Sequence, residues 1–315
     1  MQKKMLFLKF SSLGDVILSN YTAMKLKEAY PDYSLTWVTD SMYEEIVASQ
    51  PWVDNVISWN RKKDGNRGFF DIIKRIRREK YDLLVDMHTT DRSSIMSLFS
   101  GIRKRVSPYS GKYPFCLTGT LDQRFSCFSE GLFGCRKYLY SLNKFAVKDI
   151  CDKNKHKGKI IALPIGASYE KKRWPVESWT EFCRLCKEKD YVLILLGNGR
   201  DEVEASDEIT ANAGYDGIIN LVGKLTMNEL IDTVDFADAT ISGDTGTLHI
   251  ARALGRPVIG LFGPTLLKPG YMESLGATFF TACPDKGCEK WECTKECLST
   301  ISPADVCNKL ELLLI

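Results

Sequence analysis

Four short polar segments of this 315-residue chain hold residue types that could do chemistry, and each directly follows an apolar run. They are Ser11 to Asp15, Gly166 to Pro175, Leu196 to Glu202 and Ser242 to His249. A carboxylate in such a loop can take a proton from a hydroxyl, and small or hydroxylated residues at a helix N-terminus can hold a phosphate. Loops that follow parallel strands share one edge of a sheet, where ligands bind. The four segments are therefore the candidate site.

The loop Ser11 to Asp15 joins an apolar run to a helix pattern, and its single carboxylate has two interpretations. As an N-cap, Asp15 would stabilise the following helix by about 1 kcal/mol. As a general base, it would accept the proton of an attacking hydroxyl. The loop alone favours the cap.

The segment Ser242 to His249 follows another apolar run and opens another helix pattern. The hydroxyls of Thr245 and Thr247, with the free amides of the first helical turn, would form a cradle for a diphosphate, and the helix dipole would attract its charge. A plain capped helix, with Asp244 or Thr245 as its cap and His249 packed on its inner face, fits the same residues.

The other two loops are also open to two interpretations. In Gly166 to Pro175, Lys172 or Arg173 could neutralise charge on a departing diphosphate, or could belong to a solvated basic loop. In Leu196 to Glu202, an acid could bind the two ribose hydroxyls of a nucleotide. It could equally complement the dipole of the next helix from its first turn.

Strand-like and helix-like runs alternate along the whole chain, which is typical of parallel sheets with helices on both faces. We expect strands at Met5 to Lys9, Ser34 to Val38, Asn55 to Ser58, Leu83 to Asp86, Lys159 to Leu163, Tyr191 to Leu196, near Ile218, Ala239 to Ser242 and Pro257 to Phe262. Helices should begin near Val16, Tyr43, Phe69, Ser93, Ser178, Asp201, Met227 and Thr247. The fold class is therefore α/β with doubly wound sheets.

The length predicts two such domains, because 315 residues exceed the size at which one core keeps growing. We place them at residues 1–158 and 159–315, with the polar stretch before residue 159 as the linker. The carboxyl ends of their strands would face one central cleft. We leave open whether the last helix packs back on the N-terminal domain.

The composition excludes a disordered chain but few other classes of protein. The formal charge of +3 gives no reason to expect nucleic acid binding, but Arg61 to Lys80 and Arg92 to Lys112 are locally basic. Such stretches suit an anionic substrate, an anionic membrane face or a solvated surface. No apolar run is long enough for a signal sequence or a membrane span, so we expect a cytoplasmic protein with reduced cysteines.

Three strings in this order and spacing resemble the heptosyltransferases of glycosyltransferase family nine, which build the lipopolysaccharide core. The strings are SSLGD after the first strand, KRWP in the third loop, and SGDTGTLHIARALGRPVIGLFGPT. The resemblance spans nearly the whole chain. It implies a GT-B fold of two Rossmann-like domains, with the acceptor on the N-terminal domain and an ADP-sugar on the C-terminal domain.

The resemblance also implies roles for individual residues. It makes Asp15 the catalytic base, reversing the preference for a cap, and places Lys172 on the donor phosphates with Ser168 beside it. The remaining donor-binding residues it implies are Glu202 on the ribose and Asp244, Thr245, Gly246, Thr247 and His249 on the diphosphate. The acceptor-side residues are Ser11, Gly14, Asp86, His88, Arg92 and Arg103.

The implied reaction is an inverting heptosyl transfer from an ADP-sugar to a lipopolysaccharide core or similar glycan, with no metal and no cofactor. We expect a monomer that makes peripheral contact with the inner membrane, where such acceptors are anchored. Near the C-terminus, Cys283, Cys288, Cys293 and Cys297 lack the paired spacing of common zinc sites. Free thiols are expected there, and a metal remains the alternative.

Other functions fit less well. A nucleotide-sugar epimerase of the same architecture would need further acid and base groups around the sugar, and the chain has only three histidines. A transferase with another donor sugar remains an alternative. An NAD-dependent oxidoreductase would carry G-x-G-x-x-G after the first strand, which is not found. A binding protein without activity would not need both Asp15 and Lys172.

Overall fold

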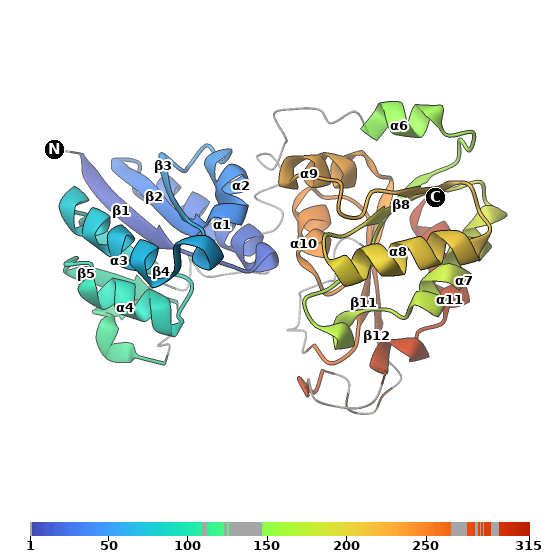
Figure 1. Cartoon of the computed structure of the whole chain (residues 1–315). Helices are drawn as coiled ribbons and strands as arrows, with labels where there is room; N and C mark the ends of the chain where they lie inside the picture. Colours follow the sequence, from blue (N-terminus) through green and yellow to red (C-terminus); the bar gives the residue numbers. More distant parts are fainter. Residues whose placement is uncertain are drawn as a thin grey trace. The chain divides into compact units, whose positions relative to one another are not determined.

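The computed structural model describes residues 2–108, 112–122, 125, 147–265, 276–280, 283, 285, 287–290 and 296–315. The chain forms two compact units, Met1–Leu139 and Tyr140–Ile315 (Figure 1). In the second unit, α6 (Val147–Lys153) packs against α9 (Met227–Phe236). The helix α6 therefore belongs with the second unit, although the sequence suggested a linker there. Among the described residues, no helix is long and apolar enough to cross a membrane.

The first unit is a parallel sheet in the order β3-β2-β1-β4-β5-β6. Its strands are β1 (Lys3–Leu8), β2 (Tyr33–Asp40), β3 (Asn55–Trp59), β4 (Leu83–Asp86), β5 (Lys104–Ser107) and β6 (Gly119–Thr120). Its helices are α1 (Leu13–Ala29), α2 (Glu44–Ala48), α3 (Arg61–Glu79) and α4 (Asp91–Phe99), with the short 3-10 helices η1 (Ser41–Tyr43) and η2 (Pro114–Cys116).

The core of the first unit follows from the alternation of side chains along its strands. Leu6 and Leu8 of β1 point to one face of the sheet, where α3 buries an apolar stripe at helical spacing. That stripe consists of Phe69, Ile72, Ile73 and Ile76, and Met96 of α4 joins the same cluster. The helices α3 and α4 therefore cover the same face of this sheet.

The second unit repeats the architecture, with a parallel sheet in the order β12-β11-β10-β7-β8-β9. Its strands are β7 (Ile160–Pro164), β8 (Val192–Leu196), β9 (Ile218–Asn220), β10 (Ala239–Gly243), β11 (Val258–Phe262) and β12 (Gly276–Phe280). Its other helices are η4 (Glu170–Lys172), α7 (Val176–Lys187), α8 (Arg200–Ala213), α10 (Gly246–Ala253), η5 (Cys297–Thr300) and α11 (Pro303–Leu313).

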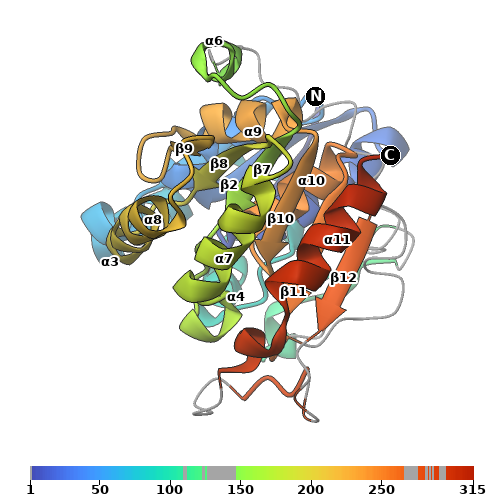
Figure 2. The same ribbon diagram turned by 90° about the vertical axis from the view of Figure 1, so that its right-hand side faces the viewer.

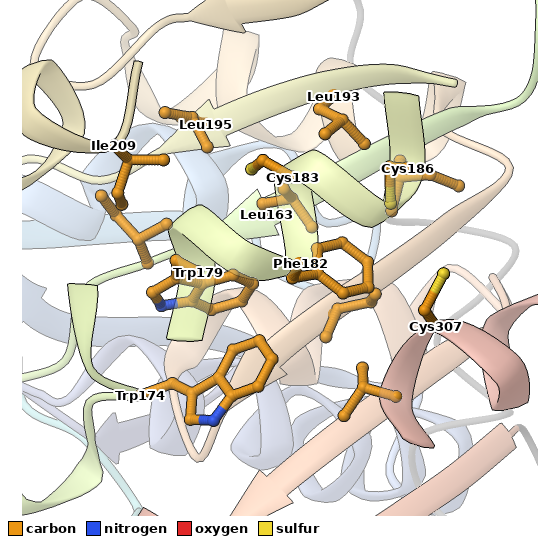
Figure 3. Close-up of a cluster of buried hydrophobic side chains, with 14 of the residues drawn as sticks. Leu163, Trp174, Trp179, Phe182, Cys183, Cys186, Leu193, Leu195, Ile209 and Cys307 are labelled. Atoms are coloured by element: carbon orange, nitrogen blue, oxygen red, sulfur yellow. The ribbon is translucent and has the colours of Figure 1, made fainter. Parts of the chain in front are cut away.

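The C-terminal helix α11 packs within the second unit, against α7 and β12, and Figure 2 shows α7 and α11 side by side. Its Cys307 and Leu310 belong to the same buried cluster as Trp179 and Phe182 of α7. Figure 3 shows Cys307 beside these aromatic rings and Cys186.

The strand order places the candidate loops at the switch point of each sheet. In the first sheet the order reverses direction between β1 and β4, and in the second between β7 and β10. Ligands of open parallel sheets bind outside the carboxyl ends of the strands at this point. The loop with Asp15 follows β1, and the loop with Asp244 follows β10. Both predicted site loops therefore lie where sheets of this kind bind ligands.

Candidate functional site

Asp15 is the third residue of α1, and its carboxylate closes the first turn. Oδ2 accepts hydrogen bonds from the backbone N–H and the hydroxyl of Ser12, each at 3.2 Å. The structure thus makes Ser12 the residue at the helix start, with Asp15 reaching back to it. The side chain of Asp15 is nevertheless 52% exposed. A carboxylate in this position can meet a substrate hydroxyl while it supports the helix.

Lys9 lies beside Asp15, and the sequence analysis did not select it. Its Nζ is 3.6 Å from Oδ2 of Asp15 and donates a hydrogen bond to the carbonyl of Met87 at 3.3 Å. Burial lowers the pKa of Lys9, although the charge of Asp15 opposes this effect. The signal that could have found it is a lysine at the end of the buried run MLFLKF. Lys9 links the loops after β1 and β4.

Asp86 ends β4, on the other side of the switch point, and His88 lies in the loop that follows. Oδ1 of Asp86 accepts the backbone N–H groups of His88 and Thr89, each at 2.9 Å. Asp86 is 2% exposed, and this desolvation raises its pKa, although the bonds from the Thr89 and His88 amides oppose the rise. The side chain predicted to contact the acceptor therefore holds its own loop in shape.

The ring of His88 packs on Phe10, with centroids 4.6 Å apart. Burial, and after it the charge of Lys9, lowers the pKa of His88 to about 4, while Asp15 and a backbone hydrogen bond with Ser11 act in the opposite direction. His88 is consequently neutral at pH 7. The contact with Ser11 brings the loop after β4 against the loop after β1.

The structure separates the two predicted acceptor-side arginines. Arg92 lies in the first turn of α4, after β4, with its guanidinium carbon 5.4 Å from the ring centroid of Trp59. Arg103 directly precedes β5, so it lies at the opposite edge of this parallel sheet. Arg92 therefore shares the edge of Asp15, whereas Arg103 does not. Gly14 is buried within the first turn of α1.

In the second unit, Lys172 and Asp244 form a close ion pair, with Nζ 2.5 Å from Oδ2. The hydroxyl of Thr265 donates to the same oxygen at 3.0 Å, and Nε2 of His249 is 3.7 Å from Oδ1. Desolvation raises the pKa of Asp244, but hydrogen bonds from His249 and Lys172 outweigh it and hold the pKa well below its usual range. Three segments far apart in the sequence thus converge on one carboxylate.

Gly243 explains how the loop carrying Lys172 reaches Asp244. A Cβ atom at Gly243 would lie 2.4 Å from the backbone carbonyl oxygen of Lys172. Real Cβ atoms essentially never approach backbone so closely, so only glycine allows η4 to pass over the end of β10. The glycine before the diphosphate motif therefore has a structural reason.

Thr245 is the N-cap of α10, which settles the alternative between Asp244 and Thr245. Its hydroxyl accepts from the backbone N–H of Leu248 and lies 2.9 Å from the hydroxyl of Ser242. Gly246 and Thr247 form the first helical turn, where backbone N–H groups lack intrahelical partners. These donors, next to the ammonium of Lys172, make a site suited to phosphate oxygens.

The remaining predicted donor residues lie after β7 and β8. Glu202 accepts the backbone N–H groups of Asn198 at 2.7 Å and Gly199 at 3.2 Å, so it closes the first turn of α8. A Cβ atom at Gly166 would lie 2.0 Å from its carboxylate, which shows that Glu202 lies over the end of β7. Ser168 is exposed in the loop between β7 and η4.

The contacts of Arg173 differ from the role considered for it, which was to neutralise charge on a departing diphosphate. Its guanidinium donates to the carbonyl of Ala167 at 2.7 Å and 2.9 Å and pairs with Asp201.

Thr265 was not selected from the sequence as a site residue. Its signal was the loop after the strand PVIGLF, at the same edge as Asp244. The structure therefore adds Thr265 to the second cluster and gives Arg173 a structural task.

The metal alternative at the cysteines remains a prediction. Within the described part of the chain, no group of three or more His, Cys, Asp or Glu residues is placed to hold a metal ion. Cys288 is a free thiol. Cys293 lies outside the described residues.

The chain is similar to known proteins in sequence and in fold. The model of glycosyltransferase family 9 (heptosyltransferase) matches residues 135–297. Lipopolysaccharide heptosyltransferase 1 of Campylobacter coli is 26% identical over 340 residues, covering 96% of this chain and 96% of the relative. The family 9 glycosyl transferase structure from Veillonella parvula DSM 2008 has a TM-score of 0.82 at 20% identity, covering 99% of this chain and 97% of that one.

The E. coli heptosyltransferase WaaC, solved with ADP-2-deoxy-2-fluoro heptose, has a TM-score of 0.73 at 18% identity and covers 98% of this chain and 99% of that one. These likenesses identify the fold as GT-B, as expected from the sequence. The family match extends over the loops that carry Lys172 and Asp244. The chain is a glycosyltransferase and belongs to glycosyltransferase family 9, the heptosyltransferases.

Proposed function

We propose that this protein transfers a heptose from an ADP-heptose donor to a lipopolysaccharide core or similar glycan acceptor, with inversion and without a metal. The observation that carries the proposal is the family match over residues 135–297, which contains the whole cluster around Asp244. The named relative from Campylobacter coli is a lipopolysaccharide heptosyltransferase, and WaaC was solved with an ADP-heptose analogue. Both names agree with this substrate class.

The donor diphosphate would bind at the second switch point. Backbone N–H groups of Gly246 and Thr247 and the ammonium of Lys172 supply fixed positive charge there. Such preorganised groups stabilise the negative charge that develops on a departing diphosphate. Asp244 and Thr265 hold the ammonium side of this site in place, and Glu202 is the proposed contact to the ribose.

The acceptor would bind at the first switch point, beside Asp15. The carboxylate of Asp15 takes the proton of the acceptor hydroxyl, whose oxygen forms a bond to the anomeric carbon. The bond from that carbon to the diphosphate oxygen breaks, and ADP leaves from the opposite face of the sugar. The ammonium of Lys9 lies beside this carboxylate, 3.6 Å from Oδ2. Because the acceptor is lipid-linked, we also propose peripheral contact with the membrane.

The test uses ADP-heptose, a deacylated core acceptor and EDTA. We expect one heptose to be added to the acceptor, with the anomeric configuration opposite to that of the donor by NMR. Lys172→Met should lower the rate by about a hundredfold, because one preorganised cation is lost from the leaving group. Lys171→Met, the neighbouring lysine, is the matched control and should keep the rate. A product with retained configuration, or activity that requires added Mg²⁺, would contradict the proposal.

A further inference from the structure

The helix α4 buries its small polar residues and exposes its large apolar ones. Ser93, Ser94 and Ser97 are buried with Met96, whereas three large apolar side chains face outward. These are Ile95, 40% exposed, Leu98, 43% exposed, and Phe99, 53% exposed. A helix on the surface of a globular protein normally shows the reverse arrangement. The outer face of α4 is therefore an apolar surface suited to contact with a partner rather than with water.

The neighbouring 3-10 helix η2 extends this apolar face. Phe115 of η2 is 68% exposed, and η2 packs against α4. Lys112, just before η2, pairs with Asp91 in the first turn of α4 at 3.2 Å. We call Ile95, Leu98, Phe99 and Phe115 the α4 patch. Contiguous exposed apolar side chains of this kind mark interaction surfaces.

The surroundings of the α4 patch are strongly basic. Residues 61–80, which comprise α3 and its C-cap Lys80, contain nine Lys or Arg and three Asp or Glu. Residues 92–112 contain five basic and no acidic residues. The guanidinium of Arg77 in α3 donates to the carbonyl of Phe99 at 3.1 Å, so α3 borders the patch. Arg78 and Lys104 are exposed. This concentration occurs in a chain whose total formal charge is only +3.

We infer that the α4 patch docks on an anionic lipid bilayer, with its apolar side chains inserted between headgroups and the surrounding cations on the lipid phosphates. Apolar side chains inside a basic border are the combination that interfacial helices use on anionic membranes. A second copy of this chain fits the same face poorly. A symmetric dimer would set the same basic border against itself, and like charges across an interface are unfavourable.

The α4 patch extends along α4 between the two edges of the sheet. The first turn of α4 follows β4 at the edge where the loop with Asp15 follows β1, and the helix runs from there toward the opposite edge. The helix η2 precedes β6, and Nε of Arg105, near the start of β5, donates to the carbonyl of Cys116 at 2.7 Å. The helix η2 therefore lies toward the edge opposite the proposed base. This inference rests on the proposed function for its biological meaning, and vesicle binding tests it separately.

The experiment is co-sedimentation of the full chain with vesicles of phosphatidylglycerol and phosphatidylcholine, compared with vesicles of phosphatidylcholine alone. We expect binding to the anionic vesicles that weakens at high salt. Leu98→Ser/Phe99→Ser should reduce it by about tenfold or more, because two apolar side chains no longer enter the bilayer. The matched control is Met42→Ser/Leu312→Ser, because Met42 in η1 is 60% exposed, Leu312 in α11 is 66% exposed, and neither belongs to the patch.

Three further measurements decide whether the inference holds. Leu98→Ser/Phe99→Ser should melt as the wild type does and transfer heptose to a deacylated acceptor at the wild-type rate, so that failure of the patch and failure of the proposed function remain distinct. The inference is overturned if this variant binds vesicles as tightly as the wild type does, or if the wild type does not bind them. It is also overturned if the two substitutions abolish a concentration-dependent dimer, which would assign the patch to a second copy.

Discussion

An ammonium group lies beside a carboxylate at the switch point of each sheet, but in two different environments. Lys9 is 3.6 Å from Asp15, whose side chain is 52% exposed. Lys172 is 2.5 Å from Asp244, whose side chain is 12% exposed. The open carboxylate can meet a hydroxyl and take its proton, whereas the enclosed one is held as an anion that positions a lysine. The difference in exposure supports separate roles, a base in the first unit and a phosphate site in the second.

His88 allows a test of the packing beside Asp15. Burial lowers its pKa from 6.5 to about 4, so the folded protein binds a proton less readily than the unfolded chain does. The stability that depends on neutral His88 is therefore complete above pH 6.5 and is lost as the pH falls toward about 4. NMR titration should show one imidazole that titrates near pH 4, and His88→Phe should remove that signal. A signal that titrates near pH 6.5 would contradict the packing on Phe10.

At the residue scale, motifs were predictable and their partners were not. Asp15 and Asp244 follow recognisable strands, so the sequence predicted their loops. Lys9 and Thr265 also stand at strand ends, but their contacts are known only from distances between segments, 3.6 Å to Asp15 and 3.0 Å to Asp244. Local sequence carries no information on such contacts.

At the scale of elements, most strands were predicted, including the edge strands β3 and β9, and three strands were missed. The strands β1, β4, β7, β8, β10 and β11 are apolar runs and appear within a few residues of the expected positions. The edge strands β6 and β12 were missed, as was β5, next to the edge, whose four residues include Lys104 and Arg105. Missing β5 also misplaced Arg103, because a residue before a parallel strand lies at the opposite edge from one after it.

The apolar spacing in α4 would also mislead a reader of the sequence. Ile95, Leu98 and Phe99 stand at helical spacing and would predict a buried face, but the structure buries the serines instead. Periodicity identifies one face of a helix, and only packing decides which way that face points.

The side chain of His156, which follows α6, contacts residues that follow α7 and α8. Its contribution to stability changes with pH in the direction opposite to that of His88. Its Nδ1 is 2.5 Å from Asp190, after α7, and its Nε2 is 2.6 Å from Asp216, after α8. Hydrogen bonds with Asp216 and Asp190 raise the pKa of His156 above 6.5. The stability it adds is therefore complete below pH 6.5 and is lost as the pH rises through the higher folded-state pKa.

Urea unfolding of the wild type and His156→Asn measures this effect. The difference in unfolding free energy between them should be largest below pH 6.5 and should shrink in alkaline buffer. A difference that stays constant with pH would mean that the two aspartates do not hold a charged imidazole.

At the scale of the whole molecule, the chain contains two units of the same architecture, and the charged groups in the two units are arranged differently. Both units are parallel sheets with the same kind of switch point. The first combines the exposed carboxylate of Asp15 with the basic border of the α4 patch, and the second combines helix amides with Lys172. The two-domain α/β fold was predictable from length and alternation, whereas the proposed roles of the two units rest on the contacts at each switch point.

The most direct test of this account is acceptor-dependent release of ADP from ADP-heptose, in EDTA, by the wild type and Asp15→Asn. Asparagine keeps the size of the side chain and an oxygen for the Ser12 bonds, so the helix start should survive. Asp305→Asn, another first-turn carboxylate, in α11, is the matched control. The account predicts a loss of about a hundredfold or more in Asp15→Asn alone, the scale of a missing general base. Release that stays within a few fold of the wild type in Asp15→Asn would contradict it.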